Sequence, residues 1–127
     1  MGYDEARNLR RCREINEGEN SMFFYNDDIE LTDPAPGIHR KVLAHDDGLM
    51  ICEFLLDEGT LLASHTHPNK QITYVVHGHL RYTVGDETHE VHGGDSVLIP
   101  GNVSHEILVL EDTLVVDTFS PARADFL

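Results

Sequence analysis

From Met22 onward the chain is divided into short apolar runs that turn residues interrupt at close intervals. Runs of about five to eight residues have the length of single β-strands. Turn signals such as Asp47-Gly48, Glu58-Gly59 and Gly93-Gly94 lie between them. The expected strands span residues 40–44, 49–56, 61–64, 72–76, 79–84, 87–91, 96–99, 106–110 and 113–119. So many short strands predict an all-β sandwich or barrel.

The connections between these strands are too short for helices. No amphipathic segment of about 10 to 15 residues separates consecutive strands, so the pairing should be mainly antiparallel. Residues 32–37 contain Pro34 and Pro36, which lack the amide hydrogen that a central strand must donate. We therefore expect a turn-rich loop at an edge of the sheet.

The first part of the chain has a different pattern. Residues 4–16 are rich in helix formers, with Asp4 placed as an N-cap and Gly18 placed to end the helix. A chain of 127 residues suits one hydrophobic core. We expect a short helical extension over residues 1–21 and a single β domain over residues 22–127.

The charge balance argues against several classes of partner. Asp and Glu number 23 against nine Lys and Arg, which gives a net charge of −14. Such a chain repels nucleic acid and anionic membrane surfaces, and no apolar run approaches the roughly 20 residues that cross a bilayer. The N-terminus lacks the pattern of a secretory signal, so a cytoplasmic location is expected. Cys12 and Cys52 have no CxxC partner, and we expect both to be reduced and non-catalytic.

Two histidines and a glutamine form a candidate metal site. His65 and His67 are two residues apart, so on an extended strand both imidazoles project from the same face. Gln71 begins the next strand and shares a face with Thr73 and Val75, which would point into a barrel. Its amide oxygen can coordinate a hard or borderline cation. These residues predict a site for one divalent ion.

The spacing of this group resembles the first sequence motif of the cupin family. Gly59, His65, His67, Gln71 and Gly78 follow that motif, although its last ligand is usually Glu rather than Gln. Gly94, Pro100, Asn102 and His105 follow the second cupin motif, with Asn102 where Gly is common and Val109 where the motif usually ends in Asn. The resemblance implies a small jelly-roll barrel, also called a double-stranded β-helix, with His105 as the third imidazole ligand.

The predicted ligand set carries no negative charge. Three neutral imidazoles and an amide leave the charge of a divalent ion uncompensated, which makes it a stronger Lewis acid and favours an anionic substrate. The donors suit zinc, nickel, manganese, cobalt or iron, so the metal identity stays open. The remaining histidines are expected on solvated faces or turns: His39, His45, His77, His79, His89 and His92.

Residues 71–127 further resemble small cupins of the pectin-degradation protein KdgF type. The resemblance rests on the segments 71–75 and 117–127. It implies conversion of 4,5-unsaturated uronates to the linear 4-deoxy-5-keto uronate, with an Asp-Phe-Arg pattern that Asp117, Phe119 and Arg123 match. In this hypothesis Arg123 binds the uronate carboxylate, Asp117 moves a proton and Phe119 packs against the sugar ring. Arg40 and Tyr74 are further candidates for substrate binding.

Several alternatives remain open from the sequence. Asp117 could end a strand, Arg123 could form a surface ion pair and Phe119 could belong to the core. The barrel could instead serve a metal-dependent dioxygenase, or a non-catalytic module that binds a small molecule such as a sugar. By analogy with small cupins, and because exposed edge strands need cover, a homodimer is expected.

Overall fold

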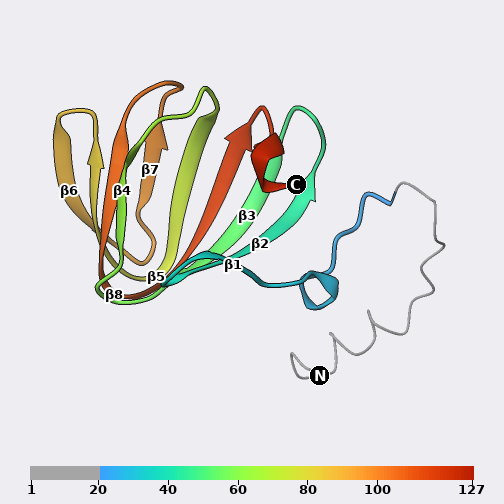
Figure 1. Cartoon of the computed structure of the whole chain (residues 1–127), viewed down its shortest axis with the longest axis horizontal. Coiled ribbons are helices and arrows are strands. Elements are labelled where there is room, and N and C mark those ends of the chain that lie inside the picture. Colours follow the sequence, from blue (N-terminus) through green and yellow to red (C-terminus); the bar gives the residue numbers. More distant parts are fainter. Residues whose placement is uncertain (1–20) are drawn as a thin grey trace.

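The computed structural model describes residues 21–127, and the helix expected within residues 4–16 lies outside this range. The described part is almost entirely β-structure, with two single-turn 3-10 helices (Figure 1). The strands are β1 (Thr32–Ala35), β2 (Ile38–His45), β3 (Met50–Leu56), β4 (Leu61–His65), β5 (Lys70–Val84), β6 (Glu87–His92), β7 (Ser96–Ile99) and β8 (His105–Ser120). The 3-10 turns are η1 (Asn26–Asp28) and η2 (Ala124–Phe126).

The strands form the two walls of a jelly-roll barrel, and every strand pair is antiparallel. The main path of the sheet runs β1-β2-β3-β8-β5-β6, while β4 pairs with β8 and β7 pairs with β5. Strand β8 pairs with β4 near its start and with β3 near its end. Strand β5 pairs with β7 near its start and with β6 near its end. The all-β antiparallel barrel expected from the sequence is therefore confirmed.

Strands β5 and β8 are each one long strand where the sequence predicted two. The expected breaks near Gly78 and near Glu111-Asp112 are wrong, because hydrogen bonding between the two strands continues past both points. Irregularities in register lie between Val75 and Leu80 instead. Gly78 adopts a φ of 117°, which L side chains rarely adopt, so the chain can bulge here and bend from one wall to the other without ending the strand.

Residues 32–35 also differ from the expectation. They form the short edge strand β1 rather than a loop, and β1 pairs only with β2. The prediction of an edge position is confirmed, since Pro34 needs no ladder partner on the open side of an edge strand. Gly37, with a φ of 78°, makes the turn into β2.

The barrel interior is apolar along most of its length. Alternate residues of β3, namely Met50, Cys52, Phe54 and Leu56, point inward and are buried. Burial, and to a lesser degree the nearby Asp117, raise the pKa of the Cys52 thiol to about 12, so this cysteine is a poor nucleophile. No helix in residues 21–127 is long and apolar enough to span a membrane.

Polar side chains interrupt this core in one region. They come from the β4–β5 connection and from strands β5 and β8, and they are at most 7% exposed. The set comprises His67, Asn69, Gln71, Thr73, His105 and Asp117. A further buried polar residue, Thr113, lies apart from them beside Gly78, where its hydroxyl accepts a hydrogen bond from the His79 amide and donates one to the Glu111 carbonyl. Burying polar groups costs free energy unless they find partners, so their concentration in one region marks it as a candidate functional site.

Candidate metal centre and substrate cavity

Three histidines converge at one end of the barrel cavity. His65 ends β4 and His105 begins β8, and the two are cross-strand partners. His67 lies in the β4–β5 connection, which the amide of Asn102 holds by donating a 2.8 Å hydrogen bond to the His67 carbonyl. One nitrogen from each imidazole lies within 4.8 Å of one nitrogen from each of the other two. Asn102, which stands where the second motif commonly has Gly, has a φ of 63°, in the left-handed region that Gly and Asn tolerate.

Backbone carbonyls orient all three imidazoles. Each Nδ1 atom lies 2.9–3.0 Å from a carbonyl oxygen two residues away along the chain. The carbonyls belong to Ala63, Asn69 and Val103. Because a carbonyl only accepts, each Nδ1 must carry the proton, which leaves Nε2 as the atom with a free lone pair. This is the tautomer that metal-binding histidines commonly adopt.

The environment keeps the two buried histidines neutral. Burial lowers the pKa of His105 to about 4, and burial followed by the charge of Arg123 lowers the pKa of His67. His105 Nε2 is buried and has no hydrogen-bond partner among the described residues. An unpartnered buried lone pair is costly, and a bound cation would satisfy it.

Gln71 adds a fourth oxygen donor to the three imidazoles. Its Oε1 lies 2.9 Å from His67 Nε2, while its Nε2 donates a 3.1 Å hydrogen bond to Thr73 Oγ1. The bond to Thr73 fixes which end of the amide faces His67. With His67 neutral and protonated on Nδ1, two lone pairs face each other across this contact. A cation between them would attract both lone pairs. The three histidines and Gln71 therefore fit a divalent metal ion.

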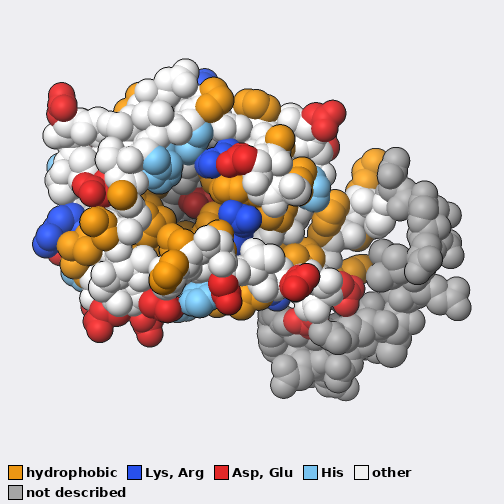
Figure 2. Space-filling view, in the orientation of Figure 1, with side chains coloured by type: hydrophobic (Ala, Val, Ile, Leu, Met, Phe, Trp, Pro, Cys, Tyr) orange, Lys and Arg blue, Asp and Glu red, His pale blue; other side chains and the backbone are white. Residues whose placement is uncertain are grey.

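A cavity of about 390 Å³ opens beside these four residues. Its lining includes His65, Gln71, His105, Asp117, Arg40 and Arg123, together with apolar side chains. Figure 2 shows the hollow, with histidine and basic side chains around it and an acidic side chain deep inside. The cavity is therefore mostly apolar, with a few charged groups directed into it, as in many small-molecule sites.

Asp117 ends a chain of buried hydrogen bonds within the cavity. The hydroxyl of Thr73 donates a 2.6 Å bond to Asp117 Oδ1 and also lies 3.1 Å from the Tyr82 hydroxyl. Burial raises the pKa of Asp117 to about 6, although hydrogen bonds from Thr73 and Gln71 and the charge of Arg123 act in the opposite direction. A carboxyl group with such a pKa can exchange protons near neutral pH.

Arginine and phenylalanine side chains form one wall of the cavity, consisting of Arg40 from β2 together with Phe119, Arg123 and Phe126 from the C-terminal end of the chain. We call this the C-terminal wall. The guanidinium carbon of Arg123 lies 5.3 Å from the Phe119 ring centre and 4.3 Å from that of Phe126. The guanidinium carbon of Arg40 lies 4.1 Å from the Phe126 ring centre. Arg123 also forms an ion pair of 2.9 Å with Asp125, and Phe119 is only 2% exposed. The ion pair of Arg123 and the burial of Phe119 agree with the alternatives in which Arg123 forms a surface ion pair and Phe119 belongs to the core. The side chains of Arg123 and Phe119 nevertheless line the cavity.

One predicted pocket residue lies elsewhere. Tyr74 is 47% exposed and projects from the outer face of β5, because residues alternate sides and Thr73 and Val75 point inward. Tyr74 is therefore not among the residues that line this cavity. The other histidines also lie outside the site; His79, for example, stacks on His92 at 4.0 Å between ring centres and bonds Glu90.

Three residues of the site were not predicted as site residues. Thr73 had been expected only to face inward, and Tyr82 and Phe126 had no assigned role. The alternation of Leu80 and Tyr82 along the strand could have indicated that Tyr82 is buried. No sequence signal indicates that Phe126, in the turn after β8, packs against Phe119 at 5.6 Å between ring centres.

Comparisons with known proteins agree with this geometry. The cupin domain model matches residues 52–117. The pectin degradation protein KdgF of Dickeya dadantii (strain 3937) is 32% identical over 107 residues, which cover 83% of this chain and 97% of that protein. The structure of KdgF from Halomonas sp. has a TM-score of 0.79 and 38% identity, and the match covers 83% of this chain and 99% of that one. An RmlC-like cupin from Shewanella frigidimarina NCIMB 400 has a TM-score of 0.81 and 30% identity, covering 85% and 97% of the two chains.

Proposed function

This chain belongs to the cupin family, with relatives of the KdgF type, and we propose that it is a metal-dependent isomerase that opens the ring of 4,5-unsaturated uronates. The product would be the linear 4-deoxy-5-keto uronate of pectin or alginate breakdown. The similarity to KdgF supports a sugar-derived substrate. The observation that carries the proposal is that Asp117, three of the four candidate metal ligands and two arginines line the same cavity.

The reaction needs one proton to move and no oxidant or reductant. The anomeric hydroxyl at C1 loses its proton as the bond between C1 and the ring oxygen breaks, which leaves an aldehyde at C1 and an enolate at C5. The same proton then adds to C4, and the enolate becomes the C5 ketone. Substrate and product have the same composition. A single acid–base group that takes the first proton and returns it to C4 is sufficient.

Asp117 is the residue that we assign to this proton transfer. Its carboxyl group is 7% exposed, and the Thr73 hydroxyl holds one oxygen in place. With a pKa raised to about 6 it would be largely ionised at neutral pH yet remain a usable acid after it accepts a proton. Positioned general acids and bases contribute rate factors of about 10²–10⁴.

The remaining residues of the cavity would bind and orient the sugar. His65, His67, Gln71 and His105 would hold the divalent ion, which would supply Lewis acidity to a sugar oxygen when bound. Phe119 would pack against the ring, and the arginines of the C-terminal wall would bind the carboxylate, Arg123 being the one that the family resemblance implies. The apolar lining would limit the access of water to the reacting atoms.

The ultraviolet absorbance of an unsaturated uronate monomer tests the proposal. The metal-loaded protein should remove the signal of the 4,5 double bond faster than spontaneous ring opening in a sample without enzyme. His105→Ala, which removes one candidate metal ligand, should abolish the acceleration. A decay equal to that of the enzyme-free sample would refute the isomerase.

The alternatives give different results in the same set of experiments. Oxygen uptake that depends on a redox-active metal, without turnover of the uronate, would favour a dioxygenase. Equilibrium binding of a uronate without turnover, and with the same affinity in Asp117→Asn, would favour a binding module.

A further inference from the structure

The cavity contains much of the positive charge of the described part of the chain. Only five of the nine Lys and Arg residues fall after residue 21: Arg40, Lys41, Lys70, Arg81 and Arg123. Two of the five, Arg40 and Arg123, line the cavity. In a chain of net charge −14, this placement creates a local attraction for an anion inside an acidic protein.

The two arginines differ in how their hydrogen bonds are used. Arg123 donates from Nε to Asp125 Oδ1 at 3.0 Å and from Nη2 to Asp125 Oδ2 at 2.9 Å. That two-point contact occupies the edge of the guanidinium with which an arginine commonly grips a carboxylate. Arg123 could bind a substrate through this edge only after it releases Asp125.

Arg40 has no such partner. Its Nε atom is buried and unpaired, and the recorded ion pairs of residues 21–127 include none with Arg40. A buried donor without an acceptor is costly, and the cost is greater when the donor belongs to a charged group. Arg40 lines the cavity, and within residues 21–127 its Nη groups have no ion-pair partner either, so an anion that enters the cavity can accept hydrogen bonds from this guanidinium.

Phe126 holds this guanidinium in place. The Arg40 guanidinium carbon lies 4.1 Å from the centre of the Phe126 ring, which in turn packs against Phe54 at 6.2 Å and Phe119 at 5.6 Å between ring centres. Stacking on an aromatic face restrains a guanidinium while leaving its in-plane N–H donors available. Less conformational entropy is then lost when an anion binds.

We propose that Arg40, rather than Arg123, is the principal ligand of the substrate carboxylate, and that it makes the cavity selective for acidic over neutral sugars. This inference rests on the proposed function. In this arrangement Arg123 is a positioning residue: it is tied to Asp125 and packs on Phe119 and Phe126, so it shapes the wall on which Arg40 stacks.

Kinetics of single-residue variants separate the two arginines. Arg40→Met keeps an apolar side chain of similar reach and removes the charge, so we expect KM for the unsaturated uronate to rise by about 10- to 100-fold, with kcat changed far less. Arg40→Lys keeps the charge without the two-point contact and should fall between wild type and Arg40→Met. Arg123→Met should raise KM less than Arg40→Met does.

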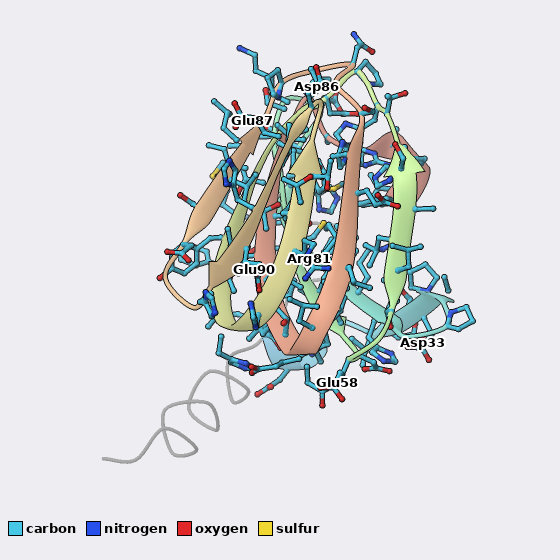
Figure 3. All side chains as sticks on the ribbon, turned by 90° about the vertical axis from the view of Figure 1, so that its left-hand side faces the viewer. Asp33, Glu58, Arg81, Asp86, Glu87 and Glu90 are labelled. Atoms are coloured by element: carbon cyan, nitrogen blue, oxygen red, sulfur yellow. The ribbon has the colours of Figure 1, made fainter. Side chains whose placement is uncertain are left out.

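Arg81→Gln is the matched control for loss of one positive charge. Arg81 is exposed on β5 and pairs across the strands with Glu90, away from the cavity, and both are labelled in Figure 3. Its removal should leave KM unchanged. An equal rise in KM for Arg81→Gln and Arg40→Met would show a general charge effect and would overturn the inference.

Equilibrium binding gives a second readout that does not need turnover. In calorimetric titrations of the metal-loaded protein, wild type should bind the saturated sugar acid galacturonate more tightly than galactose, and Arg40→Met should lose that preference. If wild type turns over the uronate but Arg40→Met keeps its KM and its preference for galacturonate, the role of Arg40 is refuted while the proposed function stands. If wild type neither turns over nor binds uronates, the proposed function fails and this inference fails with it.

Discussion

Replacing Thr73 by valine would remove one hydroxyl group from the centre of the buried hydrogen-bond chain. Thr73 is 1% exposed; its hydroxyl donates to Asp117 at 2.6 Å and accepts from the Gln71 amide at 3.1 Å. Valine has nearly the same shape, so the cavity walls should be preserved. What is lost is the hydrogen bond that favours the ionised form of Asp117.

The size of the effect follows from the strength of that bond. A hydrogen bond to a charged group contributes about 1.5–3 kcal/mol, and about 1.36 kcal/mol corresponds to one pKa unit. Thr73→Val should therefore raise the pKa of Asp117 by about one to two units above its value of about 6. A smaller ionised fraction at pH 6 would lower kcat/KM there by about 5- to 50-fold if the carboxylate is the base.

The pH dependence of kcat/KM measures this shift. The acidic limb of the profile should move to higher pH in Thr73→Val, and much of the lost activity should return as the pH rises. Carbon-13 NMR titration of the Asp117 carboxyl in the metal-free protein gives the same pKa without any assay of turnover.

Thr83→Val is the matched control, because the Thr83 hydroxyl bonds that of Thr88 on an exposed part of β5 and does not reach Asp117. The control should leave both profiles unchanged. If Thr73→Val loses activity by the same factor at every pH and the Asp117 titration does not move, the hydroxyl does not set the pKa of Asp117, and the reasoning is refuted.

Three further predictions concern catalysis, metal binding and the fold. Asp117→Asn should lower kcat by about 10²–10⁴-fold. Because burial raises the folded-state pKa of Asp117 from 3.8 to about 6, wild type but not the variant should also lose about 2 kcal/mol of unfolding free energy as the pH rises from 4 to 7. Parallel stability curves in urea unfolding would contradict this. Chelation should lower the melting temperature and added zinc, nickel, manganese or cobalt should restore it; a melting temperature indifferent to both would argue against a metal site. Gly78→Ala should lower the free energy of unfolding by about 2–5 kcal/mol, since a Cβ there would lie 2.6 Å from Thr113 Cα at a φ of 117°. Gly59→Ala is the control: with a φ of 86° and open space around the added Cβ, it should cost only about 1–2 kcal/mol. Equal losses in urea unfolding would show that the contact with Thr113 is unimportant.

Local sequence patterns predicted most of the barrel and the grouping of the candidate metal ligands. Alternation along β5 placed Gln71 inside, and the spacing of His65 and His67 placed them together, because these relations depend only on neighbouring residues of one strand or turn. His105 required the second motif, since its pairing with His65 joins strands that are 40 residues apart in sequence.

Features that depend on register between distant strands could not be predicted in the same way. Thr73 meets Asp117 only because β5 and β8 pair in one particular register. Arg40 meets Phe126 only because the turn after β8 folds back over the cavity, which no local pattern encodes. The same limitation explains the missed continuity of β5 and β8, since turn-forming residues inside a long strand look like strand ends until their partners are known.

The three imidazoles donate hydrogen bonds to main-chain carbonyls, so most side chains that would contact substrate can change without disturbing the candidate metal site. In many metal sites the ligands are oriented by other side chains, so a mutation that reshapes the pocket also disturbs the metal. Here Ala63, Asn69 and Val103 contribute only backbone oxygens to this task, and substitutions there that preserve the backbone would leave the imidazoles aimed as they are. Arg40 and Phe126 can then vary with little effect on ligand geometry, so a barrel of this kind could acquire new substrates while retaining its metal site. Phe119 is the exception, because its ring packs edge-on against that of His67 at 5.8 Å between ring centres.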